Sequence, residues 1–360
     1  MALQRSMTPA GESLVAPADR GRRRFLAAAA AAIGISQLGF GAAARAGAAP
    51  AGTGVQHMPD TSFGPLRQID AGDLSVAYVD AGPAAGPPVI LLHGWPYDIH
   101  SFAEVVPLLT AAGHRVIVPY LRGYGGTRFR AQGTPRNGQP AALAADLIAL
   151  MDALGIGQAL LAGFDWGARD ANIVAALWPE RCRAMVSVSG YLIGSQAANR
   201  APLAPRAELA WWYQYYFATE RGRRGYAENT DAFARLIWET ASPRWRFDDA
   251  TFGRSAEAFH NPDHVAIAIH NYRWRLGLAD GEPRYDEIEQ RLAALPEIHV
   301  PTITLEGDAN GAPHAEPAAY RAKFRGPYLH RLVEGGIGHN LPQEAPRAFA
   351  NAVLMASRMG

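Results

Sequence analysis

The sequence has a single cysteine, almost no net charge and no uninterrupted apolar run of membrane-spanning length. Cys182 is the only cysteine in 360 residues, which excludes an internal disulfide framework. The formal net charge is +1, so composition gives no electrostatic case for nucleic acid or acidic partners. Internal repeats are absent. With 49% hydrophobic and 19% charged residues, the chain has the balance of a globular protein.

The first 46 residues have the features of an export signal. Three arginines at 22–24 precede an alanine-rich apolar run that extends to about Phe40, and small residues at 42–46 suit signal peptidase. The paired arginines followed by Phe-Leu resemble a twin-arginine signal, which carries folded proteins across the bacterial inner membrane. The run is short and interrupted by glycine, which favours a cleaved signal over a membrane anchor. We expect a periplasmic or secreted protein with no stable span after cleavage, and the small residues allow cleavage after Ala46 or near Ala48.

A linker rich in Ala, Gly, Pro and Thr follows at residues 47–62, and strand and helix patterns then alternate. Strands are predicted at 74–79, 88–92, 115–118, 158–162, 183–188, 301–306 and 328–333, and helices at 102–112, 141–154, 168–177 and 342–355. Apolar strands that alternate with helices indicate a mostly parallel sheet flanked by helices.

The alternation stops between about Tyr191 and Leu276, where the chain is aromatic-rich and helical without strand signals. Such a block cannot extend the sheet, so it predicts a helical cap inserted over one edge. We therefore expect the first part of an α/β core at residues 63–190, a helical cap at 191–280 and the second part of the core at 281–360.

The segment Gly163-Phe164-Asp165-Trp166-Gly167 joins a predicted strand to a predicted helix. The sequence strand, small residue, nucleophile, small residue, helix is typical of a nucleophile elbow. The two glycines suit a turn that leaves no room for side chains, and the helix N-terminus can stabilise negative charge. Asp165 could simply cap the helix, but capping does not explain the paired glycines. We predict that Asp165 is a catalytic nucleophile.

Three further elements complete a predicted catalytic set: an oxyanion hole, a general base and an orienting acid. His93-Gly94-Trp95-Pro96 follows a buried strand, so the backbone N–H groups of Trp95 and Trp166 can form an oxyanion hole. His339 follows the last predicted strand and is the expected general base. Asp308, in the turn after the strand that ends at Glu306, is the candidate acid that orients the imidazole. It could instead be a turn residue that satisfies its own backbone.

These motifs, together with Arg122-Gly123-Tyr124-Gly125, resemble the epoxide hydrolase and haloalkane dehalogenase branch of the α/β-hydrolases. The resemblance covers nearly everything after the signal and linker. It implies an α/β-hydrolase fold with a helical cap and a hydrolase that needs neither cofactor nor metal. The order Asp165, Asp308, His339 matches nucleophile, acid and base in these hydrolases. One departure concerns the acid, which in the family often occupies the position of Asn310.

An aspartate nucleophile suits displacement at a saturated carbon, which forms an ester of the enzyme that water then hydrolyses. The resemblance aligns Tyr213 and Tyr272 with the two cap tyrosines that assist ring opening in epoxide hydrolases. Tyr215 is the alternative to Tyr213 in a second register. These aromatic residues could also be only the core of the cap. We predict an epoxide hydrolase that acts on a small molecule.

A haloalkane or haloacetate dehalogenase is the alternative function. Arg169 matches one of two arginines that bind carboxylate in haloacetate dehalogenases, whereas Trp166 occupies the position of the other. Arg169 is therefore a candidate substrate-binding residue, although we favour a structural salt bridge for it. A non-catalytic binding protein with this fold is a third alternative, and the retained candidates for all three catalytic residues argue against it.

Overall fold

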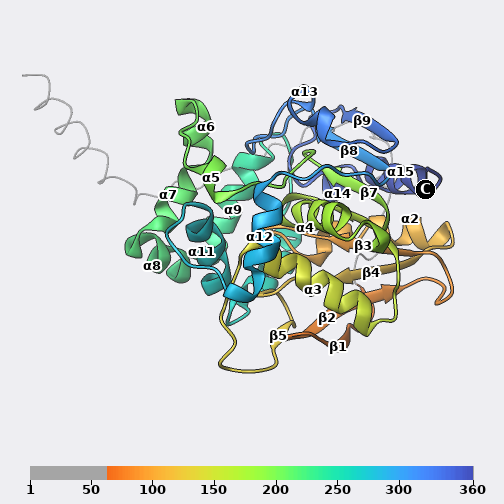
Figure 1. Ribbon diagram of the computed structural model, residues 1–360, viewed down its shortest axis with the longest axis horizontal. Coiled ribbons are helices and arrows are strands. Elements are labelled where there is room, and N and C mark those ends of the chain that lie inside the picture. Colours follow the sequence, from red (N-terminus) through yellow and green to blue (C-terminus); the bar gives the residue numbers. More distant parts are fainter. Residues whose placement is uncertain (1–62, 360) are drawn as a thin grey trace, which may run out of the picture. The chain divides into compact units, whose positions relative to one another are not determined.

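The computed structural model describes residues 63–359. The predicted export signal and linker, residues 1–62, lie outside the described residues. Within residues 63–359 the chain forms one nine-stranded sheet with helices on both faces (Figure 1). Its strands are β1 (Arg67–Ala71), β2 (Leu74–Ala81), β3 (Pro88–Leu92), β4 (Arg115–Pro119), β5 (Arg128–Phe129), β6 (Ala159–Gly163), β7 (Cys182–Val188), β8 (Thr302–Gly307) and β9 (Tyr328–Val333).

The strand order is β1-β2-β4-β3-β6-β7-β8-β9, with β5 paired to β2. All pairs from β4 to β9 are parallel, whereas β1 and β2 run antiparallel to their neighbours. The first crossovers are made by the α-helices α2 (Val105–Ala111), α3 (Pro140–Ala153) and α4 (Asp165–Leu177) and by the 3-10 helices η1 (Ile99–Phe102) and η2 (Pro179–Arg181). The chain ends in α14 (Leu341–Glu344) and α15 (Pro346–Ala356), after α13 (Pro317–Tyr320) and η5 (Arg321–Lys323).

Strand β3 shows why the sheet is covered on both faces. Val89 and Leu91 belong to one buried cluster, together with side chains of α2 and α15. Ile90 and Leu92 belong to a second cluster on the opposite face, with side chains of α3 and α4. Successive strand residues point to opposite faces, so a continuous apolar run is stable only where both faces are covered. Each such side chain contributes about 1.5–3 kcal/mol when it is fully buried.

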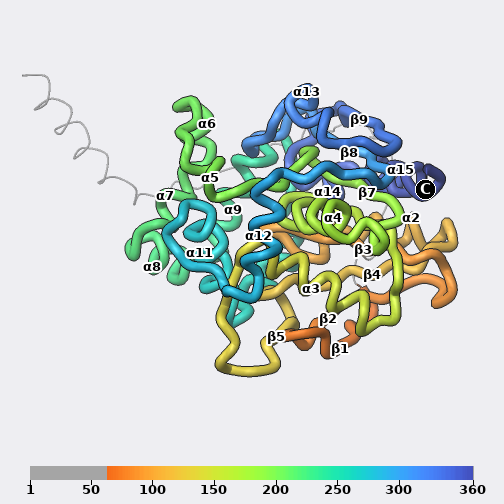
Figure 2. Tube along the Cα trace, viewed as in Figure 1, coloured from red at the N-terminus to blue at the C-terminus, as the bar shows by residue number. Residues whose placement is uncertain are grey.

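Between β7 and β8 the chain leaves the sheet and forms a helical cap, an excursion that Figure 2 traces by colour from green to blue. It contains α5 (Gln196–Asn199), α6 (Pro205–Ala210), α7 (Trp212–Ala218), α8 (Glu220–Glu228), α9 (Thr230–Ala241), α10 (Asp249–Ala256), η3 (Glu257–His260) and α11 (His264–Arg275). The chain then returns to the core through η4 (Pro283–Tyr285) and α12 (Asp286–Ala293), and α12 packs against α3. The predicted fold class, a mostly parallel sheet with an inserted helical cap, is confirmed.

Aromatic side chains form the interior of this cap. Phe217, Tyr226 and Trp238 are fully buried, and the rings of Phe217 and Phe233 stack 5.2 Å apart. The Trp238 indole N–H donates a hydrogen bond of 2.7 Å to the carbonyl of Pro96 and so fixes the cap to the loop after β3. Large rings contribute much buried area, and an indole N–H usually finds an acceptor when it is buried. The cap is therefore packed onto the core at the end of the sheet where β3 terminates.

Four details of the fold differ from the sequence prediction. Strand β1 was not expected, because most of its side chains are exposed and it lacks an apolar run. Strand β5 was not expected either, because it has only two residues. The helix expected at 102–112 is divided into η1 and α2. The helix expected at 342–355 is divided into α14 and α15 at Pro346, whose ring fixes φ and removes an N–H donor.

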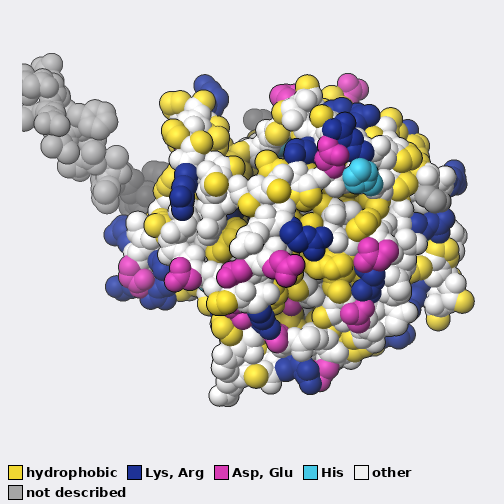
Figure 3. Space-filling view, in the orientation of Figure 1, with side chains coloured by type: hydrophobic (Ala, Val, Ile, Leu, Met, Phe, Trp, Pro, Cys, Tyr) yellow, Lys and Arg dark blue, Asp and Glu magenta, His cyan; other side chains and the backbone are white. Residues whose placement is uncertain are grey.

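The surface carries no dominant charge of one sign on the face in Figure 3, where acidic and basic side chains are interspersed. This distribution agrees with the small net charge. In residues 63–359 we find no helix that combines the length and apolar character needed to cross a membrane.

Candidate active site

Asp165 lies on a sharp turn between β6 and α4 and has a positive φ of 52°. The glycines on each side of it are required by space. A Cβ at Gly167 would lie 2.1 Å from the carbonyl oxygen of Leu92, and one at Gly163 would lie 2.7 Å from the carbonyl carbon of Gly167. A non-glycine residue in this backbone region costs free energy, and such residues cluster at functional sites. The turn therefore has the geometry expected of a nucleophile elbow.

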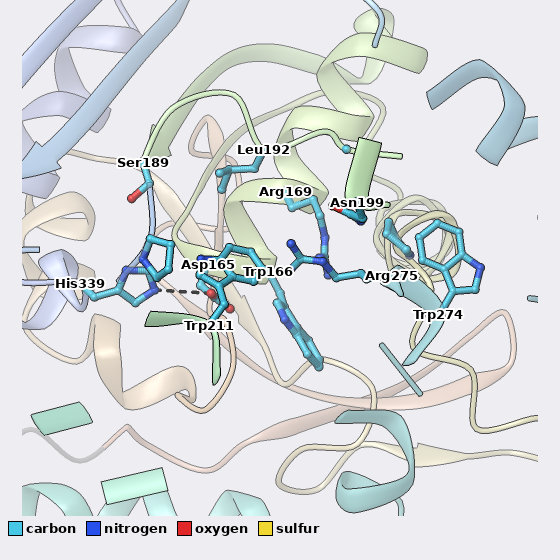
Figure 4. A pocket seen from close by; sticks show the side chains of 13 residues that line it. Asp165, Trp166, Arg169, Ser189, Leu192, Asn199, Trp211, Trp274, Arg275 and His339 are labelled. Carbon is cyan, nitrogen blue, oxygen red and sulfur yellow. Dashed lines mark ion pairs between the residues drawn. The ribbon is translucent and has the colours of Figure 1, made fainter. Parts of the chain in front are cut away.

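The Asp165 carboxylate is held from two sides. The backbone N–H of Trp95 donates to Oδ1 at 2.8 Å, and Nε2 of His339 lies 3.5 Å from Oδ2 (Figure 4). Burial raises the pKa of Asp165, but the hydrogen bond and charge of His339 and the N–H groups of Trp95 and Trp166 outweigh burial. The net result is a pKa below the usual value. The carboxylate is thus ionised at neutral pH, and the two predicted oxyanion-hole N–H groups both face it.

The loop that carries Trp95 lies directly against the elbow. A Cβ at Gly94 would come within 2.3 Å of the Cβ of Asp165, so only glycine fits at this position. The indole N–H of Trp95 donates to the Tyr226 hydroxyl at 2.9 Å, and this hydroxyl lies 2.8 Å from Nε2 of His264. The backbone of Trp95 therefore serves Asp165 while its side chain binds the cap.

His339 lies in the loop between β9 and α14 and is held mainly through its backbone. Its N–H donates to Oγ of Ser242 at 2.9 Å, and that hydroxyl donates to Glu344 at 2.6 Å. Glu344 also accepts the N–H of Gly338 at 2.7 Å. Sequence reasoning missed Ser242 and Glu344, because neither lies in a motif and Ser242 is nearly 100 residues from the loop it supports.

Asp308 does not orient the imidazole in the structure, contrary to the prediction. Its side chain is exposed, and its carboxylate accepts backbone N–H groups of Gly335, Gly336 and Ile337 at 3.2, 2.8 and 2.9 Å. These successive donors hold the carboxylate in the turn, and within residues 63–359 we find no hydrogen bond between it and His339. Nδ1 of His339 is buried without a partner. The buried carboxylate at this strand end is Glu306, which accepts from Asn310 at 2.7 Å.

Tyr213 on α7 and Tyr272 on α11 come together above Asp165, with ring centroids 5.2 Å apart and nearly perpendicular. Both line a cavity of about 310 Å³ that also contains Asp165, Trp95 and His339. Burial is the largest cause that raises the pKa of each phenol far above its ordinary value, and the nearby Asp165 carboxylate adds to it. Both hydroxyls are therefore protonated at neutral pH and can donate hydrogen bonds.

Tyr215 lines neither of the two cavities that contain Asp165, so the alternative register is not supported. Its side chain is 47% exposed, and its hydroxyl donates to Glu208 on the surface of the cap. Residues two positions apart on a helix point in different directions, so Tyr213 and Tyr215 cannot face the same cavity.

Arg169 lies one helical turn after Asp165 and lines a second cavity of about 120 Å³ (Figure 4). The salt bridge that we favoured for it does not form in the described part of the chain. Nε and Nη2 of Arg169 are buried without hydrogen-bond partners. Arg275, at the end of α11, lines the same cavity and was missed by sequence reasoning. Only the fold of the cap brings it beside Arg169. Among residues 63–359 no cluster of three or more His, Cys, Asp or Glu side chains could hold a metal ion.

Comparison with known proteins agrees with this geometry. Residues 87–225 match the alpha/beta hydrolase fold family. A solved structure of a candidate epoxide hydrolase from Klebsiella pneumoniae subsp. pneumoniae is 66% identical with a TM-score of 0.81. The match covers 81% of this chain and 97% of that one. The chain therefore belongs to the α/β-hydrolase fold family and is an α/β-fold hydrolase of the epoxide hydrolase-like kind.

Curated relatives match over shorter lengths. Epoxide hydrolase B from Mycobacterium tuberculosis is 38% identical over 160 residues, which are 41% of this chain and 44% of that protein. A haloalkane dehalogenase from Psychrobacter cryohalolentis is 42% identical over 73 residues, which are 19% of this chain and 24% of that protein. The chain thus aligns with less than half the length of these relatives.

Proposed function

We propose that the chain is an epoxide hydrolase in which Asp165 is the nucleophile. The observation that carries this proposal is the position of an ionised carboxylate on the elbow opposite two protonated cap phenols, Tyr213 and Tyr272, in one cavity. The similarity to proteins named epoxide hydrolases supports it.

In the first step an oxygen of Asp165 attacks a ring carbon of the epoxide and the carbon–oxygen bond of the ring breaks. The product is an ester of Asp165, and the released alkoxide takes a proton from Tyr213 or Tyr272. Proton donation by a positioned phenol lowers the barrier because charge develops on the leaving oxygen in the transition state.

In the second step water attacks the carbonyl carbon of the ester while Nε2 of His339 accepts the proton of the water. The backbone N–H groups of Trp95 and Trp166 stabilise the resulting oxyanion. When this intermediate collapses, the bond to the alcohol oxygen breaks, that oxygen takes the proton held by His339, and the diol leaves. The carboxyl group of Asp165 returns its proton to the tyrosinate formed in the first step, which regenerates the carboxylate and the phenol. The hydrogen bond from Trp95 to Oδ1 supports this role, because the donor already lies 2.8 Å from that oxygen.

Replacing His339 with Gln tests the mechanism. The variant is expected to form the ester but to hydrolyse it slowly, so that a peptide containing Asp165 gains the mass of the epoxide. Mass spectrometry after brief exposure to an epoxide panel measures this. An Asp165→Asn protein treated in the same way is the matched control and should remain unmodified. Absence of any adduct on Asp165 in the His339→Gln protein across the panel would contradict the proposal.

A dehalogenase is the second candidate function, because the Trp166 indole N–H is buried without a partner beside Asp165 and could bind a halide. The Trp95 indole N–H, in contrast, is already bonded to Tyr226. One unoccupied indole donor favours this candidate less than two tyrosines favour the first. Diol and halide formation measured side by side on the same protein distinguish the two: halide release without any diol selects the dehalogenase.

We also propose that residues 1–46 direct export through a twin-arginine-type pathway. Paired arginines ahead of an apolar run support this proposal. Expression of the full chain in a bacterium, followed by fractionation, is expected to place the shortened protein in the periplasm. Replacing Arg22 and Arg23 with Lys should retain the uncut protein inside the cell, and unchanged export of that variant would contradict a twin-arginine signal.

A further inference from the structure

Two arginines converge on the side of Asp165 that faces away from His339 (Figure 4). Arg169 comes from the elbow helix and Arg275 from the last turn of a cap helix, and both line the cavity of about 120 Å³ that also contains Asp165. Among residues 63–359, Asp165 is the only acidic residue that lines this cavity. The cavity therefore holds two guanidinium groups and one carboxylate.

The guanidinium of Arg169 is buried and has donors without partners in the described part of the chain. The residue is only 7% exposed, and its Nε and Nη2 atoms have no hydrogen-bond partner in residues 63–359. A buried charge without partners is costly, so such donors call for a partner such as a ligand, an ion or a water molecule. The adjacent Asp170 does not neutralise it, because burial raises the pKa of that carboxyl to about 8.

Aromatic rings hold both arginines in place without using their donors. The guanidinium carbon of Arg275 lies 4.2 Å from the centroid of the Trp211 ring, and that of Arg169 lies 5.7 Å from the Trp166 ring. Contacts of this kind orient a guanidinium group while its planar N–H donors stay available for a bidentate partner.

The cavity of about 310 Å³ adjoins the cavity of about 120 Å³ at the nucleophile. The two share Asp165, Trp211, Arg275, Pro313 and His339, and the larger one is otherwise lined mainly by apolar and aromatic groups of the cap. A molecule that reacts at Asp165 thus has a cationic compartment on one side and a larger apolar compartment on the other.

We propose that Arg169 and Arg275 bind a carboxylate of the substrate, and that the substrates are epoxides with a carboxylate on one ring carbon and an apolar group on the other. This inference rests on the proposed epoxide chemistry at Asp165. The carboxylate occupies the smaller cavity, the apolar group occupies the larger one, and the ring lies between them at the nucleophile. Planar carboxylates match the fork of N–H donors on a guanidinium group, which gives the site both affinity and orientation.

The test compares two substrates that differ only in charge, 3-phenyloxirane-2-carboxylate and the corresponding carboxamide. The wild-type protein is expected to show a kcat/KM for the acid at least tenfold above that for the amide. Arg169→Met and Arg275→Met should each lower this acid-to-amide ratio at least tenfold. The control Arg206→Met removes an exposed positive charge from the cap and should leave the ratio unchanged. Arg169→Lys keeps the charge and should retain a higher ratio than Arg169→Met.

Calorimetric binding of unreactive analogues separates this inference from the proposed function. 2-Phenylcyclopropane-1-carboxylate is expected to bind the wild-type protein at least tenfold more tightly than its carboxamide, and the preference should disappear in Arg169→Met and Arg275→Met. Hydrolysis of the epoxides without this preference, or a preference that survives both substitutions, overturns the arginine site. Carboxylate binding that depends on both arginines, without hydrolysis of either epoxide, overturns the proposed function and leaves the site in place.

Discussion

Replacing Asp170 with Asn is expected to stabilise the protein by an amount that increases with pH. Asp170 lies on α4, only 1% exposed, and neither carboxylate oxygen has a hydrogen-bond partner in the described residues. Burial, opposed only in part by Arg169, raises the pKa of this carboxyl to about 8. The folded protein therefore holds the neutral acid at pH 7, whereas the unfolded chain ionises it with an ordinary pKa of about 3.9.

The sign follows from proton linkage. A group whose pKa is raised on folding favours the folded state at low pH, and this contribution is lost as the pH rises from about 3.9 through about 8. At pH 7 the solution is about three pH units above the pKa of this carboxyl in the unfolded chain. Ionisation of the unfolded chain therefore lowers the free energy of unfolding by about 4 kcal/mol relative to low pH. Asn has nearly the same shape and cannot ionise, so the variant avoids this penalty.

Urea unfolding of the wild-type and Asp170→Asn proteins at several pH values measures the effect. The free-energy difference between them should rise by about 1.4 kcal/mol per pH unit from pH 5 to pH 8 and level off above. Asp249→Asn, at a side chain that is 94% exposed, controls for the loss of one negative charge. A difference between the two proteins that stays constant from pH 5 to pH 8 would refute the reasoning.

Three further predictions concern the elbow and the cap. Gly167→Ala should destabilise the protein by about 1–3 kcal/mol, because the added Cβ would overlap the backbone at the end of β3. The control Gly157→Ala, where no atom lies within 4 Å of the added Cβ, should change thermal stability far less. Tyr272→Phe should lower the rate of ring opening by about 10²-fold, the usual size of a general-acid contribution, and Tyr215→Phe should leave it unchanged. Equal rates for the two variants would contradict a role for Tyr272 in ring opening. Formation of the Asp165 ester in single turnovers should be constant from about pH 5 to pH 9, because the carboxylate pKa is lowered and the phenol pKa is raised beyond those limits; a midpoint inside the range would argue against these ionisation states.

The parts of the fold that follow from local patterns could be predicted from the sequence. The run that forms β3 is apolar at every position because both faces of the strand are covered, so its pattern carries the information directly. The elbow is equally readable, because the space around Gly163 and Gly167 admits only glycine. Strand β1 carries no such pattern, since it lies at the edge of the sheet with most side chains in solvent.

Residues of the site could be predicted from the sequence only where a motif determines the local backbone conformation. The position of Asp308 in the chain order predicted that it orients the imidazole. In the structure its carboxylate instead accepts three backbone N–H groups of the turn at residues 335–337. No local sequence pattern predicts such a turn. Arg275 gives no signal in the sequence, because an arginine at the end of a helix usually faces solvent or the helix dipole. Its position beside Arg169 depends on how the cap packs on the core, which is a long-range property.

The placement of the cap between β7 and β8 divides the chemistry between two separately variable stretches of sequence. The groups proposed to make and hydrolyse the ester come from the sheet and its loops, whereas both phenols and one of the two arginines come from the insertion. A gene that exchanges or diversifies the insertion can therefore acquire a new substrate range while it inherits an intact ester-forming centre. For directed evolution, the insertion is the segment to randomise, and the residues around the elbow are the segment to leave untouched.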